Sequence, residues 1–255
     1  MRSQRYGSDL TDAQWEVIAP LLAGHRSIKH PPRRILDALL YLAKTGCQWR
    51  YLPGAYPPWQ SVYYVFRRWM ARGLLRALVH RLRRLVRIRL GRAPSPSAAI
   101  IDSQSVKTSH VGGERGFDGG KLVTGRKRHI LVDTLGLLLA VLVHRADLND
   151  SQRAPQLLDR VQGEVPRLEV VFADAGYRYT PAGLIWRVFG WLWQVVEREP
   201  GQRGFVVLKK RWVVERTFAW FGGYRRLSKD YERLPAVSEA LVQLSAIRLM
   251  VRRIA

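Results

Sequence analysis

Two aspartates stand where a strand-like run of apolar residues ends. Asp102 follows the run 98–101, and Asp174 follows the run 168–173. If the two runs form neighbouring strands of one sheet, their terminal acids fall side by side. Like charges at close range repel and raise each other's pKa unless a cation binds between them. The pattern indicates a site for a cation.

A third acid, Glu215, lies in a basic and aromatic stretch, residues 209–232, whose spacing predicts a helix. Arg211 precedes it by four residues and therefore shares its helix face. Taken alone, Glu215 is an ordinary ion-pair partner for Arg211 or Arg216. The two strand-end aspartates favour a different interpretation, in which the helix places Glu215 across from them.

Three clustered carboxylates without a cysteine partner form a hard-oxygen site, which suits Mg²⁺ or Mn²⁺. Two such ions about 4 Å apart activate the attacking oxygen and stabilise the leaving oxygen of a phosphodiester. Other acidic and histidine side chains have simpler explanations. Asp133 is expected in a turn and Asp150 at a helix cap, while His129 in a strand is more often structural.

The composition points to a polyanionic partner. The 255 residues carry a formal net charge of +23, and residues 38–101 contain no acidic side chain. A membrane surface or a ribosome would also attract this charge, but neither explains the acids at strand ends.

A single cysteine, Cys47, excludes an intrachain disulfide and agrees with a reducing cytoplasm. Neither a signal peptide nor a transmembrane helix is expected, because the longest apolar run, 130–143, is short and interrupted.

The first 94 residues are predicted to form an all-α domain that resembles a helix-turn-helix module and binds DNA. Helical patterns begin at the capping box 11–14 and cover 33–45, 60–72 and 74–90, with a loop at 25–30. Side chains expected to face DNA on the third helix are Gln60, Tyr64, Arg67 and Arg68. Those expected to clamp phosphates on the fourth are Arg76, Arg83 and Arg84. A helical bundle with a merely solvated basic face is the alternative.

Residues 95–255 are predicted to form a mixed sheet with helices on its faces, after a linker at 91–97. The expected strands are 98–102, 128–132, 137–143, 168–173 and 191–196. The glycine-rich stretch 110–125 is expected to be a mobile loop, and 201–204 a second loop. The expected helices are 150–161, 180–189, the Glu215 helix, and 236–254.

Several motifs in this order resemble a known family. They are IIDSQSVKT (100–108), GRKRHILVDTLGLLL (125–139), ADLNDSQRA (146–154), FADAGY (172–177) and the Glu215 stretch, preceded by LTDAQWEVIAPLL and CQWRYLP. The chain resembles an insertion-sequence transposase of the DDE type, in the insertion sequence 5 family. This resemblance implies a ribonuclease-H-like fold in which Asp102, Asp174 and Glu215 are catalytic and bind two metal ions.

The resemblance also concerns the signature around the glutamate. Arg211 matches its arginine, whereas Leu208 replaces its tyrosine and Gly222 its lysine. Arg225, Arg226 and Lys229 are candidates for the role of that lysine. Further basic residues predicted to contact DNA are Lys107, Lys127, Arg128, Arg211, Arg225 and Arg226.

The expected function is hydrolysis of a phosphodiester at each end of a mobile element, after which the freed 3′-hydroxyls attack target DNA. The expected partners are duplex DNA with terminal inverted repeats and a second copy of the chain, in the bacterial cytoplasm at the nucleoid. Two alternatives remain: a transposase-derived DNA-binding regulator without catalysis, and a cellular nuclease. The apolar stripe of the last helix serves either a partner or its own domain.

Overall fold

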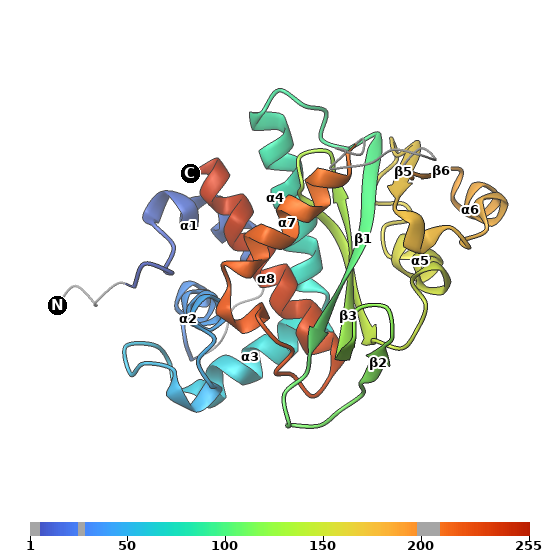
Figure 1. Ribbon diagram of the computed structural model, residues 1–255. Helices are drawn as coiled ribbons and strands as arrows, with labels where there is room; N and C mark the ends of the chain where they lie inside the picture. Colours follow the sequence, from blue (N-terminus) through green and yellow to red (C-terminus); the bar gives the residue numbers. More distant parts are fainter. Residues whose placement is uncertain (1–5, 25–28, 198–209) are drawn as a thin grey trace. The chain divides into compact units, whose positions relative to one another are not determined.

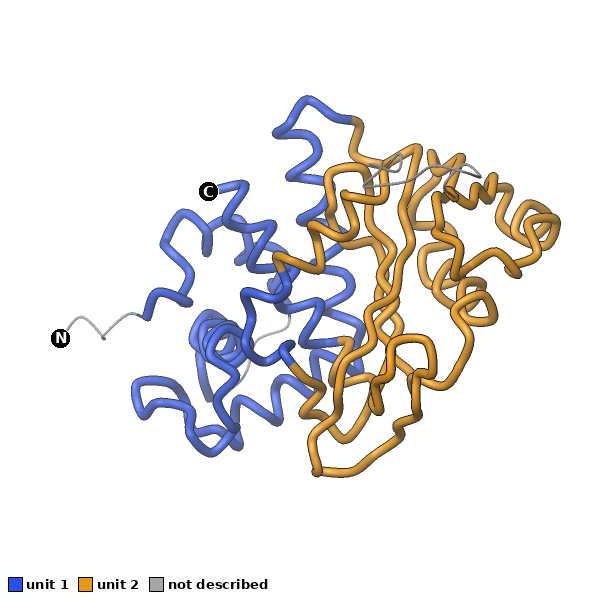
Figure 2. Tube along the Cα trace, viewed as in Figure 1, with its two compact units in different colours: residues 1–92, 221–228, 240–255 blue, residues 93–220, 229–239 orange. Residues whose placement is uncertain are grey.

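The computed structural model describes residues 6–24, 29–197 and 210–255. The chain forms two compact units (Figure 2). Unit 1 comprises Met1–Arg92, Phe221–Ser228 and Ala240–Ala255, and unit 2 comprises Ala93–Trp220 and Lys229–Glu239. The division into domains 1–94 and 95–255 did not foresee the two late segments of unit 1, and stays a prediction. The predicted loop at 201–204 and part of that at 25–30 lie outside the described residues.

Unit 1 is built from helices, as predicted. The capping box is present: Gln14 N donates to Thr11 Oγ1 at 3.2 Å, and Thr11 N donates to Gln14 Oε1 at 3.3 Å. Its elements are α1 (Asp12–Ile18), η1 (Ala19–Leu22), α2 (Pro32–Thr45), η2 (Trp49–Tyr51), α3 (Trp59–Ala71), α4 (Leu74–Arg89) and η4 (Arg225–Leu227). A helix-turn-helix assignment for this unit stays a prediction.

The late segments of unit 1 pack on the end of α2. Gly46 ends that helix with φ 73°, and a side chain there would come within 3.1–3.2 Å of Arg225. Arg226 Nη1 donates to Cys47 O at 2.9 Å, and Lys44 Nζ donates to Gly223 O at 2.6 Å. These contacts explain why residues far apart in sequence belong to one unit.

Unit 2 contains a six-stranded mixed sheet, which confirms that prediction. The strand order is β2-β3-β1-β5-β6, with β4 paired to β3. β1 is antiparallel to β3 and parallel to β5. The strands are β1 (Ala98–Lys107), β2 (Gly116–Asp118), β3 (Val123–Asp133), β4 (Leu138–Arg145), β5 (Val170–Ala173) and β6 (Leu192–Val195).

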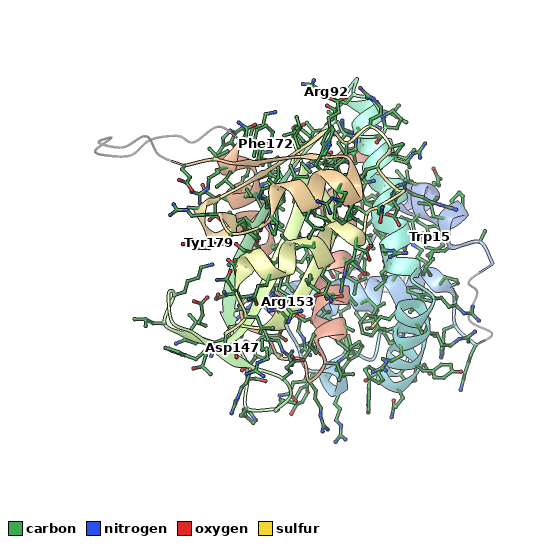
Figure 3. The ribbon with its side chains drawn as sticks, turned by 90° about the vertical axis from the view of Figure 1, so that its right-hand side faces the viewer. Trp15, Arg92, Asp147, Arg153, Phe172 and Tyr179 are labelled. Atoms are coloured by element: carbon green, nitrogen blue, oxygen red, sulfur yellow. The ribbon has the colours of Figure 1, made fainter. Side chains whose placement is uncertain are left out.

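Helices lie on both sides of β1 within unit 2: α5 (Asp150–Asp159) and α6 (Ala182–Phe189) on one, α7 (Arg211–Gly222) on the other (Figure 1). The core beneath α5 is apolar. It combines Ala99 and Ile101 of β1 with Leu157 and Leu158 of α5. Because strand side chains alternate, Asp102 faces away from this core. Figure 3 views the α5 side, where Arg153 marks the helix and Asp147 the loop before it.

The glycine-rich stretch 110–125 is not simply a loop, and that prediction was wrong. It contains β2, which pairs with the start of β3. Asp118 at the end of β2 accepts hydrogen bonds from Gly120 N at 3.0 Å and Lys121 N at 3.1 Å. A strand of three residues is too short to show an alternating pattern, so its sequence carries no strand signal.

The strands predicted at 128–132 and 137–143 form an antiparallel hairpin, β3 and β4. Asp133 is its turn residue, since its Oδ1 accepts from Leu135 N and Leu137 N, both at 2.9 Å. Strands β1 and β3 extend beyond their predicted limits, and β1 continues to Lys107, whereas β5 and β6 are shorter than predicted. The last helix, α8 (Pro235–Ile254), lies at its predicted place. Of the helices within the described ranges, none has the length and apolarity needed to cross a membrane.

Candidate active site

The two aspartates lie side by side, as expected if their strands are neighbours. The expected position of Asp102 at a strand end was wrong, because β1 continues to Lys107, whereas Asp174 directly follows β5. Ile100 of β1 is paired with Phe172 of the parallel β5. Asp102 and Asp174 each come two residues later, so they occupy the same level and the same face of the sheet. The parallel register of β1 and β5 therefore creates the acidic pair.

The pKa values of both aspartates are raised above the usual value for this side chain. Burial, followed by the charge of Asp174, raises the pKa of Asp102 to about 7. Burial also raises the pKa of Asp174, against the opposing effects of Arg211 and the Gly176 amide. Ser103 N donates to Asp102 Oδ1 at 2.6 Å, and Gly176 N donates to Asp174 Oδ1 at 3.0 Å. A cation bound near the two carboxylates would stabilise their ionised forms.

Glu215 stands apart from the pair. Arg211 Nη2 lies 3.5 Å from Glu215 Oε1 and 3.8 Å from Asp174 Oδ2, so the guanidinium is between the two acids. The Glu215 side chain is 57% exposed. Over the described part of the chain, no three acidic, histidine or cysteine side chains converge as a metal-binding group. The expected cluster of three carboxylates is thus present as a pair plus one separated glutamate.

Helix α7 is held by the turn between β3 and β4. Thr217 Oγ1 donates to Gly136 O at 3.0 Å, and Arg216 Nη2 donates to Leu135 O at 3.1 Å. Gly136 has φ +79°, and a side chain there would lie 2.7 Å from Thr217 Oγ1. The glycine is required both by the turn and by the close approach of the helix.

Asp150 belongs to the surroundings of the pair, which the sequence did not indicate. The cap of α5 is Asn149, which accepts from Ser151 N at 2.9 Å. Asp150 instead accepts from Ser103 Oγ at 2.7 Å and binds Lys127 Nζ at 2.8 Å. Burial alone would raise its pKa, but the ammonium and hydroxyl groups hold that pKa below the usual value. Adjacent Asn and Asp residues in one motif made the cap ambiguous.

His129 is part of the same buried cluster. Its Nδ1 lies 2.6 Å from the hydroxyl of Tyr177, and its ring stacks on His144 with centroids 4.8 Å apart. Burial lowers its pKa to about 3, so the ring is neutral at pH 7. Its environment fits the structural interpretation.

Lys121 also lies beside the pair. Its Nζ donates to Ser103 O at 2.9 Å, one residue after Asp102. Its charge is among the influences that lower the pKa of both Asp102 and Asp174. No sequence pattern indicated this position, because Lys121 belongs to the segment expected to be a mobile loop.

The predicted DNA-contacting residues divide by exposure. Those that are exposed are Gln60, Tyr64, Arg67, Arg76, Arg84, Lys107 and Arg225, and Arg68 and Arg211 are half-buried. Four others are buried and meet protein atoms: Arg83 with His80, Lys127 with Asp150, Arg128 with Lys229 O, and Arg226 with Cys47 O. Direct phosphate contact would require the cationic groups of these four to leave their protein partners, and it stays a prediction.

Two family models match the chain. The model described as "Transposase DDE domain" matches residues 93–250, and that described as "Putative transposase of IS4/5 family" matches residues 10–79. The first match contains Asp102, Asp174 and Glu215.

Two curated proteins are similar over part of the chain. A "Putative transposase for insertion sequence element IS402" from Burkholderia cepacia is 33% identical over 127 residues, which cover 47% of this chain and 60% of that protein. The chain thus aligns with less than two thirds of that relative. An "Uncharacterized protein y4sN" from Sinorhizobium fredii (strain NBRC 101917 / NGR234) is 31% identical over 118 residues, which cover 44% of this chain and 88% of that protein. No solved structure matches the chain significantly.

Proposed function

The chain belongs to the transposase DDE domain family, and from this premise we propose that it cuts DNA at the ends of an insertion sequence and joins them to target DNA. The observation that carries the proposal is the pair of aspartates on adjacent parallel strands, Asp102 within β1 and Asp174 directly after β5. Two neighbouring acids whose pKa values are raised, chiefly by burial, are suited to cation binding.

The donor chemistry of the pair fits divalent metal ions. Carboxylate oxygens are the ligands of Mg²⁺ and Mn²⁺, and we propose that Asp102, Asp174 and Glu215 hold two such ions. When bound, the ions would activate water or a 3′-hydroxyl and stabilise the leaving oxygen. Arg211 supplies positive charge between Asp174 and Glu215. Its release from Glu215 would free that carboxylate to serve as a ligand.

The proposed substrates are the terminal inverted repeats of the element and a target duplex. We propose that the exposed side chains of Gln60, Tyr64 and Arg67 on α3 read or position the ends, and that exposed Lys107 and Arg225 bind phosphates. The net charge of +23 supports a polyanionic partner. We place the protein in the bacterial cytoplasm at the nucleoid, acting as a homodimer on paired DNA ends.

The test is strand transfer from a duplex that carries the terminal repeat. Asp102→Asn, Asp174→Asn and Glu215→Gln should each abolish joining in Mg²⁺ while end binding persists, because each removes a proposed metal ligand. Matched controls are Asp159→Asn and Glu16→Gln, which change exposed acids away from the pair. Near-normal joining by any of the three site variants would refute the assignment of that residue.

The separation of Glu215 from the aspartates favours one alternative, a DNA-binding regulator without catalysis. The same assay decides between the two. A wild-type protein that binds the terminal repeat but neither cuts nor joins it in Mg²⁺ or Mn²⁺ would be such a regulator.

A further inference from the structure

We propose that Lys121 is a substrate-binding residue of this site, which holds the DNA phosphate at which cleavage occurs. The inference rests on the proposed function and adds a residue that the sequence motifs did not identify. It follows from where the β2–β3 hairpin places an exposed ammonium group.

The hairpin is fixed to β1 by side chains. Asp118 Oδ2 accepts from Ser105 Oγ at 2.5 Å, while its Oδ1 accepts from the amides of Gly120 and Lys121. Lys121 Nζ in turn donates to Ser103 O at 2.9 Å. The lysine is therefore positioned from both its backbone and its side chain, next to the strand residue that follows Asp102.

The ammonium group remains available for a ligand. It carries three N–H donors, and one of them is directed at Ser103 O. Among the described residues, no carboxylate lies within ion-pair distance of it. Its charge nevertheless lowers the pKa values of Asp102 and Asp174. The residue is exposed. A cation beside two acids, bonded to a neutral carbonyl, can bind an incoming anion without first breaking an ion pair.

A DNA phosphate is the anion that fits. The phosphodiester carries one negative charge and gains more as it reacts, so the two aspartates would repel it. Fixed positive charge where charge develops stabilises the transition state. Lys121 supplies such a charge from the chain itself, in addition to any bound metal ion.

The test is a cycle that combines Lys121→Met with a neutral methylphosphonate at the cleaved position of a terminal-repeat duplex. Binding by the full-length protein is measured in Ca²⁺, with cleavage checked by electrophoresis. The substitution should weaken binding to the normal duplex by about tenfold, as expected for a charge-assisted hydrogen bond. It should cause little further loss on the methylphosphonate duplex. Lys121→Arg should largely restore binding to the normal duplex.

A structural role predicts a different result. It would lower the melting temperature and weaken binding to both duplexes equally, which would overturn the inference. Equal binding by wild type and Lys121→Met would also overturn it. The control is Lys29→Met, which removes an exposed lysine from unit 1 and should affect both duplexes alike. Failure of the wild-type protein to cut in Mg²⁺ would instead refute the proposed function, so the two failures are distinguishable.

Discussion

Asp102 keeps its proton to an unusually high pH for an aspartate, because it is buried and faces Asp174. Metal binding requires the carboxylate, so a proton competes with the metal below a pH of about 7. We expect the affinity for Mn²⁺ to rise from pH 5.5 to pH 7 by up to about tenfold per pH unit, and to level off above. Calorimetric titration of the metal-free protein measures this directly.

The sign of this dependence follows from the raised pKa. Asp102→Asn should remove most of the pH dependence while also weakening Mn²⁺ binding. Asp159→Asn, at an exposed acid, should leave the pH profile unchanged. A wild-type affinity that is constant between pH 5.5 and pH 8 would show that no proton competes at the pair.

Single residues differed in how far the sequence could predict them. Asp102 and Asp174 were predictable, because a strand run that ends in an acid is a local pattern. Asp150 and Lys121 were not, because their places depend on a hairpin and a helix meeting β1. The burial of Arg83, Arg128 and Arg226 was unpredictable for a related reason. Composition shows that a side chain is basic, while only tertiary packing decides whether it reaches solvent.

At the scale of elements, the position of α7 depends on the turn at Gly136. Gly136→Ala would introduce a methyl group 2.7 Å from Thr217 Oγ1 and 2.9 Å from Trp220, at a φ of +79°. We expect a destabilisation of about 2–4 kcal/mol, from backbone strain together with the steric conflict. Strand transfer should fall more than DNA binding, since the helix carries Glu215. Thermal unfolding and the joining assay provide the measurements.

Gly163→Ala is a matched control for the turn variant. Gly163 has φ +78°, and a side chain there would meet nothing within 4 Å. The loss of stability in Gly163→Ala therefore measures backbone strain alone. The additional loss in Gly136→Ala measures the steric conflict with α7. Equal losses of stability and joining in both would show that the turn does not position the helix.

Helices and strands whose apolar residues recur with a clear period were predictable from the sequence. Short or irregular elements were not. The long amphipathic helices and the β3–β4 hairpin appear at their predicted places. Strand β2 was missed because three residues show no period. The parallel pairing of β1 with β5 could be stated only as a condition, since strand order depends on contacts between segments about seventy residues apart.

At the scale of the whole molecule, the net charge of +23 should keep free protomers apart. DNA neutralises that charge, so we expect pairing to be much stronger on terminal-repeat DNA than in its absence. Mass photometry with and without the duplex measures the change, and an unrelated duplex of equal length controls for charge neutralisation alone. A protein that stays monomeric on its end DNA, yet joins both ends, would rule pairing out.

The membership of unit 1 has a consequence for how the protein is made. Residues 1–92 are synthesised before Phe221–Ser228 and Ala240–Ala255, which the unit also needs. Chains commonly fold domain by domain during synthesis. Here the packing of η4 on α2 and the complete helical unit can form only after the residues of unit 2 that lie between have been synthesised.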